Sequence, residues 1–270
     1  MKTNFGLIAV TITLLSASLA GCMGDEDSGE EYSGPIDLIV YYDSTSGMIE
    51  TSENNGQTGP TTGVELSFDF ADTTSDSGSI SKIMIDPDDG SEPVEGDPAD
   101  NAVISYTWMT HGVFSVTLSA EDSDGNSHSI VVKVKVDMHI VWSDTNTASS
   151  SMSFDATPDC EDGDPLPDRI TVSSTAENPS GPPWAQGGSS DVTWALKNPS
   201  EEIIGESTGT IGAGSSETWD YTSRDIVEGV WTMNVEVSQE GTNTDPVNVN
   251  NDVTIAYAEG AEDATNPRPE

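Results

Sequence analysis

The sequence predicts an all-β protein built from two antiparallel β-sandwich domains, and three observations lead to this prediction. Apolar residues recur at every second position in runs from about residue 37 to about residue 257, which is the period of a half-buried strand. The runs are short and are separated by Pro, Gly, Asn and Asp. No run shows an apolar stripe at helical spacing. We expect the first domain at residues 37–137 and the second at residues 138–258.

Three runs of the first domain alternate most clearly between apolar and polar residues. Their apolar members are Val64, Leu66, Phe68 and Phe70; Phe114, Val116, Leu118 and Ala120; and Ile130, Val132, Val134 and Val136. The stretch "EDSDGNSH" separates the last two runs, and its Asp-Gly pair favours a tight turn. Residues 113–136 are therefore predicted to form a β-hairpin.

The second domain is predicted from about seven short strand candidates, which is typical of a sandwich. They include "MHIVW", "RITV", "DVTWAL", "VWTMNVEV" and "VTIAY". The inward-facing residues of the last two are Trp231, Met233, Val235 and Val237, and Val253, Ile255 and Tyr257. The boundary near Asp137 is not sharp, since "VKVKVDMHIVW" is also compatible with a strand that continues from one domain into the next.

Residues 1–21 have the three zones of a secretory signal: a positive Lys2, an apolar run at residues 6–15 and small residues at 16–21. A membrane-spanning helix needs about 20 apolar residues, and this run is shorter and diluted by Thr and Ser. The segment therefore predicts export of the chain.

The signal ends at Leu19-Ala20-Gly21-Cys22, which resembles the lipobox of prokaryotic lipoproteins. This resemblance implies that Cys22 carries lipid on its sulfur and begins the mature chain. An ordinary secretory signal with a chance cysteine is the alternative. Residues 22–36 are too polar to pack and are predicted to be an acidic tether. Residues 259–270 are predicted to be a disordered tail.

The net charge restricts the partners of the protein. Lys and Arg total 8 against 48 Asp and Glu, giving a formal charge of -40. Nucleic acid is excluded as a partner because its binding depends on Lys and Arg that neutralise phosphates. Electrostatic adhesion to an anionic bilayer is excluded for the same reason, which leaves lipid at Cys22 as the contact with the membrane. Such self-repulsion also indicates a saline habitat or divalent cations at the surface.

Two stretches of the first domain contain recognisable motifs. They are "TSDSGSI" at 74–80 and "WMTHGVFSVTLSAEDSDGN", in which Trp108 precedes Gly112 and a Gly-x-aromatic-x-Val-x-Leu strand follows. Through these motifs, residues 63–136 resemble a PKD (polycystic kidney disease) repeat, an immunoglobulin-like β-sandwich. The Trp-Asp-Phe-Gly-Asp-Gly element of the family is reduced to "MIDPDDG". The resemblance implies extracellular binding, spacing or adhesion without catalysis. The second domain is expected to be immunoglobulin-like or a jelly roll.

Few residues are candidates for chemistry. The Gly-x-Ser-x-Gly match "GESTG" at 205–209 lacks the strand-to-helix context of a nucleophile elbow. Cys160 is interpreted as a bystander. Asp122, Asp124 and Asn126 in "DSDGN" supply oxygen ligands of the kind that calcium binds, but so acidic a chain is expected to contain such clusters by chance, and we interpret them first as solvated turns. We expect no catalytic residue and no cofactor other than calcium at this turn.

The sequence therefore predicts a lipid-anchored protein on the extracytoplasmic face of an archaeal or bacterial cell membrane. Its expected function is that of a non-catalytic binding or structural module that recognises a surface protein or polysaccharide. An accessory subunit of a surface hydrolase or transporter is the second interpretation, and a secreted hydrolase is the third.

Overall fold

The computed structural model describes residues 32–160, 165–179, 188–238, 245–258 and 264–269. The signal peptide and Cys22 lie outside these residues. The described residues form strands throughout, which confirms the predicted all-β class. Among them no helix has the length and hydrophobicity needed to cross a membrane. Residues 34–270 form one compact unit.

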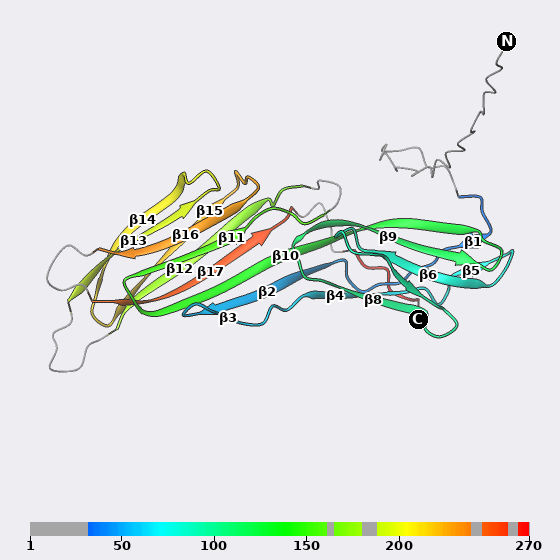
Figure 1. The fold of residues 1–270 in the computed structure, drawn as a ribbon, viewed down its shortest axis with the longest axis horizontal. Helices are drawn as coiled ribbons and strands as arrows, with labels where there is room; N and C mark the ends of the chain where they lie inside the picture. Colours follow the sequence, from blue (N-terminus) through cyan, green and yellow to red (C-terminus); the bar gives the residue numbers. More distant parts are fainter. Residues whose placement is uncertain (1–31, 161–164, 180–187, 239–244, 259–263, 270) are drawn as a thin grey trace, which may run out of the picture. The chain divides into compact units, whose positions relative to one another are not determined.

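The strands of this unit are arranged in two larger sheets and two small ones (Figure 1). The nine-stranded sheet runs β15-β12-β17-β10-β9-β6-β7, with β2 paired to β10 and β3 paired to β2. Its strands are β2 (Ser46–Asn54), β3 (Gln57–Thr58), β6 (Ile80–Asp86), β7 (Val94–Gly96), β9 (Gly112–Asp122), β10 (Ser127–Thr147), β12 (Arg169–Asn178), β15 (Ser215–Ser223) and β17 (Val247–Ala256).

The four-stranded sheet runs β11-β16-β13-β14, and two-stranded sheets join β1 to β5 and β4 to β8. Their strands are β11 (Ser149–Asp155), β13 (Ser189–Lys197), β14 (Ile203–Gly212), β16 (Val230–Val237), β1 (Ile36–Asp37), β5 (Thr74–Ser75), β4 (Val64–Asp69) and β8 (Val103–Trp108). Most pairings are antiparallel as expected, but β2 pairs with β10 in parallel.

The first hydrophobic core lies between the β4–β8 pair and the sheet formed by β6, β9 and β10. β9 and β10 form the predicted hairpin in antiparallel register, with Phe114 opposite Val134. Gly125 in the connecting turn has a φ of 86°, which a glycine adopts without strain. The predicted inward residues of β4 and β9 are buried, Phe68 and Phe114 completely.

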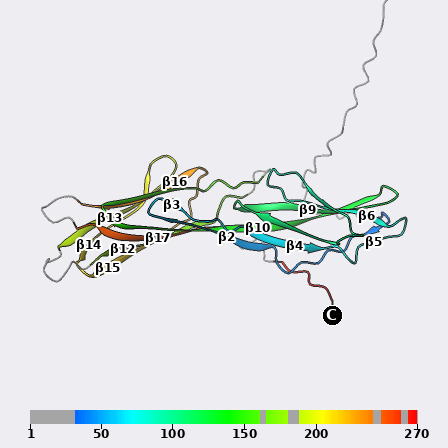
Figure 2. The ribbon, with the colours of Figure 1, turned by 60° about the horizontal axis from the view of Figure 1, so that its bottom comes forward.

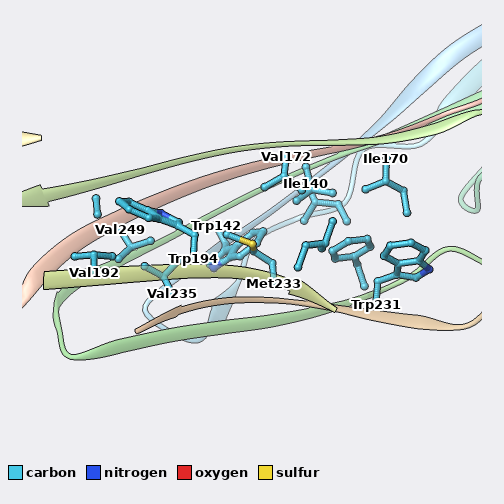
Figure 3. Close-up of a cluster of buried hydrophobic side chains, with 14 of the residues drawn as sticks. Ile140, Trp142, Ile170, Val172, Val192, Trp194, Trp231, Met233, Val235 and Val249 are labelled. Carbon is cyan, nitrogen blue, oxygen red and sulfur yellow. The ribbon is translucent and has the colours of Figure 1, made fainter. Parts of the chain in front are cut away.

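The second core lies between the four-stranded sheet and strands β12, β17 and β10. Figure 2 shows β13 and β16 on one side of it and β12 and β17 on the other. Figure 3 shows the large side chains Trp142, Trp194 and Trp231 packed in this core around Met233. The predicted inward faces of β16 and β17 are buried, which completes a second β-sandwich.

β10 contributes to both cores. Val132, Val134 and Val136 lie in the first core, whereas Ile140 and Trp142 lie in the second. Met138 packs against both cores. The expected boundary at Asp137 therefore falls inside a strand that runs without interruption from Ser127 to Thr147.

The predicted disordered tail is wrong for residues 264–269, which pack on the first core. Asn266 forms a β-bridge with Tyr42, with N–H···O distances of 2.8 and 3.0 Å. Its side chain donates to Val40 O at 2.6 Å, and Ala264 N–H donates to the Thr45 hydroxyl at 2.9 Å. The segment was missed because it docks through polar groups and has no apolar alternation. Residues 259–263 and 270 lie outside the described residues.

Removal of residues 264–270 is expected to lower the free energy of unfolding by about 2 kcal/mol. Besides the exposed contacts of Arg268, the truncation removes the four hydrogen bonds of Ala264 and Asn266. Each is worth about 0.5–1.5 kcal/mol, and the entropy of ordering the segment offsets part of the loss. Chemical denaturation measures the change. Arg268→Ala is the matched control, because its exposed ion pairs with Asp69 and Asp72 contribute less than about 1 kcal/mol. Equal stability of the truncated and full chains would contradict the docking of this segment.

Candidate functional site

A cavity of about 490 Å³ lies where β10 passes from the first core to the second. Its wall combines apolar and polar side chains from several elements. The apolar residues are Met109, Met138, Ile140, Met152, Phe154 and Pro158, and the polar residues are Thr51, Thr110, His111, Ser153, Asp155, Thr157 and Asp159. Three methionines in one wall make the cavity adaptable in shape, since the methionine side chain is unbranched and polarizable.

His111 is the centre of the polar wall. It is 6% exposed and lies in the loop between β8 and β9. Its Nδ1 is 2.8 Å from the Tyr257 hydroxyl, and its Nε2 is 3.0 Å from the Asp155 carbonyl oxygen. Tyr257 N–H donates to Asp137 Oδ1 at 2.9 Å. A chain of hydrogen bonds therefore links the ends of β17 and β11 to the start of β9.

The partners of His111 fix the tautomer of its neutral ring. The Asp155 carbonyl only accepts, so Nε2 carries the proton and Nδ1 accepts from Tyr257. Burial lowers the pKa of His111, although the backbone hydrogen bond to Asp155 and the carboxylates of Asp155, Asp159 and Asp137 act in the opposite direction. Burial also raises the pKa of Tyr257, which keeps its hydroxyl protonated. Both ring nitrogens are engaged, so the arrangement holds a neutral imidazole rather than a base ready to take a proton.

Cys160 lies beside this network. Its Sγ would be 3.1 Å from a Cβ added to Gly112, and the Phe114 ring would be 3.2 Å away. A side chain at residue 112 therefore has little space, which explains the glycine of the Gly-x-aromatic strand. Cys160 packs against the first core, and its interpretation as a bystander stays a prediction.

Sequence reasoning missed the convergence of His111, Tyr257 and Asp155. Residues 111 and 257 are 146 positions apart, and no local pattern marks such a pair. The only signal was the inward position of Tyr257 in "VTIAY", which predicts burial but not its hydrogen-bond partner.

The calcium candidates occupy the turn of the β9–β10 hairpin. The Asp122 carboxylate is buried and accepts hydrogen bonds from the hydroxyls of Ser75 and Ser77, at 2.7 and 2.6 Å. It also accepts from the backbone N–H of Asp124 and Asn126, at 3.0 and 2.9 Å. The Ser77 hydrogen bond, aided by those of Asn126 and Ser75, holds the pKa of Asp122 well below its usual range. Protein donors thus occupy these oxygens, and calcium binding here stays a prediction.

The "DPDDG" loop between β6 and β7 is held by side chains of the first core. Trp108 Nε1–H donates to Pro87 O at 3.2 Å, and Tyr106 donates its hydroxyl to Asp89 at 2.6 Å. Ser115 N–H donates to the Asp88 carboxylate at 2.7 Å. The altered PKD element therefore retains a structural role as the anchor of this loop.

Ser207 of the "GESTG" segment lies in the middle of β14, where it pairs with Trp194 of β13. A nucleophile elbow requires a sharp turn between a strand and a helix. The extended backbone at residues 205–209 does not provide that turn.

Comparison with known proteins identifies the first part of the unit. Residues 51–136 match the family model of the PKD domain. This part of the chain is a PKD-like domain. The match begins within β2 and ends in β10, at the last residue of β10 that packs only in the first core.

Comparison with solved structures gives only distant similarities. A structure of carbohydrate-binding modules from the β-sandwich superfamily has a TM-score of 0.30 at 14% identity, covering 84% of this chain and all of that one (100%). CBM51-2 of Clostridium perfringens ZmpB, solved with GlcNAc, has a TM-score of 0.24 at 13% identity, covering 83% of this chain and 49% of that one.

SGBP-B of Bacteroides ovatus, solved with a mixed-linkage heptasaccharide, has a TM-score of 0.18 at 11% identity, covering 77% of this chain and 51% of that one. No curated protein matches the sequence. TM-scores this low carry no inference about ligands. The PKD match alone supports a non-catalytic binding or structural module.

The stability of the PKD-like domain and its neighbour should depend on pH through His111. Because burial holds the pKa of His111 in the folded chain below its ordinary value of about 6.5, the unfolded chain binds more protons between the two values. The contribution of His111 to the free energy of unfolding is therefore fully present above about pH 6.5. The free energy of unfolding decreases as the pH falls below that value, by at most about 1.4 kcal/mol per pH unit for one proton. Denaturation at stepped pH should show a flatter profile for His111→Gln. An unchanged profile would contradict the buried neutral imidazole.

The hydrogen bonds in the turn of the β9–β10 hairpin predict how a substitution of Asp122 changes the stability of the protein. Asp122→Asn removes a charge that five donor groups stabilise, the Asn126 side-chain amide included. We therefore expect a melting temperature lower by several degrees at neutral pH. Asp124→Asn is the control, because the Asp124 side chain lies exposed beside the turn. Calcium and magnesium should shift the melting temperature of the native chain alike. A rise with calcium alone, lost in both variants, would instead establish a calcium site.

Proposed function

We propose that this protein is a lipid-anchored, extracytoplasmic binding module that presents two β-sandwiches close to the cell membrane and recognises a surface protein or polysaccharide. The observation that carries the binding or structural role is the PKD match at residues 51–136. The anchor rests on Leu19-Ala20-Gly21-Cys22 and on the acidic tether that follows it.

The site described above supports binding rather than catalysis. His111 in the cavity wall is held by the Tyr257 hydroxyl and the Asp155 carbonyl, so neither of its ring nitrogens is free to act on a substrate. Among the described residues, no group of three or more His, Cys, Asp or Glu is arranged to hold a metal ion. The adaptable apolar wall is instead suited to the side chain of a partner.

The anchor is tested by Cys22→Ser. Loss of the thiol removes the site of lipid attachment, so the protein should move almost completely from the membrane fraction to the medium in cell fractionation followed by immunoblotting. Cys160→Ser is the matched control, because it replaces the other cysteine of the chain and should leave the protein at the membrane. A Cys22→Ser protein that stays membrane-bound and uncleaved would show that residues 1–21 are a signal anchor.

A further inference from the structure

β11 is an outer strand that borders the junction cavity. Among the described residues it pairs with β16 on one side, and no strand pairs with its other edge. Met152, Ser153, Phe154 and Asp155 of this strand form part of the cavity wall. The open edge and the cavity are therefore neighbouring parts of one surface.

The hydrogen bonds to β16 show which main-chain groups face this edge. Ala156 N–H donates to Gly229 O at 3.0 Å, and Val237 N–H donates to Ala148 O at 2.9 Å. In an antiparallel pair, hydrogen-bonded and non-hydrogen-bonded positions alternate. The even-numbered residues from 148 to 156 thus bond to β16, and the odd-numbered ones direct their N–H and C=O groups to the open edge.

Two of the odd-numbered residues already have partners. Asp155 O accepts from His111 Nε2, and Ser149 N–H donates to the Thr147 hydroxyl at 3.1 Å. Ser151 and Ser153 remain, with a donor and an acceptor each, two residues apart along an exposed strand. This is the pattern that an extended segment recognises when it adds a strand to a sheet.

The composition of β11 distinguishes it from the outer strands β7, β14 and β15. β7 carries Glu95, β14 carries Glu206, and β15 carries Glu217 and Asp220. Charges of this kind discourage the addition of a further strand at a sheet edge. The exposed positions of β11 are Ser149, Ser151, Ser153 and Asp155. The three serines offer no such protection, and the only charge stands at the end of the strand, beside the cavity.

The cavity sets the size and polarity of one side chain of the incoming segment. Side chains of an added strand alternate between the two faces of the sheet. Those on the inner face lie level with Met152 and Phe154, beside the cavity of about 490 Å³. A volume of this size suits one large aromatic or aliphatic side chain packed against the methionines.

The negative charge of the cavity and of the whole chain determines which residues of the incoming segment lie beside its large side chain. Asp155 and Asp159 line the cavity, whereas no Lys or Arg does. The whole chain carries a formal charge of -40, so a second copy is repelled and a basic segment is attracted.

We propose that the free edge of β11 and the junction cavity bind an extended segment of a partner protein, with one large apolar side chain in the cavity and Lys or Arg beside it. This inference rests on the proposed function as a binding module.

The test uses the detergent-solubilised full chain and a short synthetic peptide with a central tryptophan flanked by alternating valines and arginines. Calorimetry or fluorescence anisotropy measures the dissociation constant. Replacing the tryptophan by serine should weaken binding at least tenfold. Replacing the arginines by glutamates should abolish it at low salt, and high salt should weaken binding of the original peptide.

The edge is tested by Ser151→Pro, with Ser151→Ala as its matched control. Both variants lose the hydroxyl that donates to Asn234, but only proline removes the N–H at the free edge. We expect at least tenfold weaker binding for Ser151→Pro and unchanged binding for Ser151→Ala, with circular dichroism confirming the fold of both. A peptide methylated on its backbone nitrogens probes the same hydrogen bonds without changing the protein, should Ser151→Pro not fold.

Three outcomes would overturn the inference. One is equal binding by Ser151→Pro and Ser151→Ala together with equal binding of the methylated peptide. Another is no measurable binding of the original peptide. The third is a dimer in analytical ultracentrifugation that Ser151→Pro dissociates, which would assign the edge to a second copy. None of these results changes the fractionation of the Cys22→Ser protein, so failure of this inference is distinguishable from failure of the proposed anchor.

Discussion

The structure depends on the continuity of β10, a single strand that serves two hydrophobic cores. Side chains of a strand alternate between its faces, so a shift of one residue would turn every inward side chain outward. Val134 and Val136 in the first core, and Ile140 and Trp142 in the second, are all on even positions. The register of the β9–β10 hairpin therefore also fixes the pairing of β10 with β17. The parallel strand β2 spans the same change of partners, pairing with residues 135–143.

The cavity is a consequence of this change of partners. β9 pairs with β10 up to Val136, and β17 pairs with it from Met138, so Asp137 lies between the two neighbouring strands. Its carboxylate accepts the N–H of Tyr257, whose hydroxyl bonds His111. These hydrogen bonds satisfy polar groups where no sheet ladder is available, and leaving them unpaired in a buried place would be costly. The same gap between ladders leaves space that the methionines only partly fill.

The sequence predicted the elements whose information is local. The alternation in β9, β10 and β16 indicates both the strands and their buried faces, because period-two patterning reflects burial directly. The pairing of β2 with β10 and the docking of Asn266 on Tyr42 could not be predicted, since both join distant segments largely through polar or backbone groups. The hydrogen bond between His111 and Tyr257 could not be predicted for the same reason, since it joins polar side chains of distant segments. At the free edge of β11, "SSSMSFD" indicates a strand, but only the ladder with β16 shows which serines face outward.

The acidity of the chain and the run of serines along the edge of β11 are physically consistent with each other. An unprotected edge normally invites pairing between copies of the same protein. Here the repulsion between two chains of charge -40 opposes that approach at long range, even though no acid stands at positions 149, 151 or 153. The charge is distributed over the whole molecule, so it discriminates by the sign of the partner rather than by local contacts. Long-range repulsion of this kind disfavours pairing of the edge with another copy of the chain, whereas a basic segment is attracted to it.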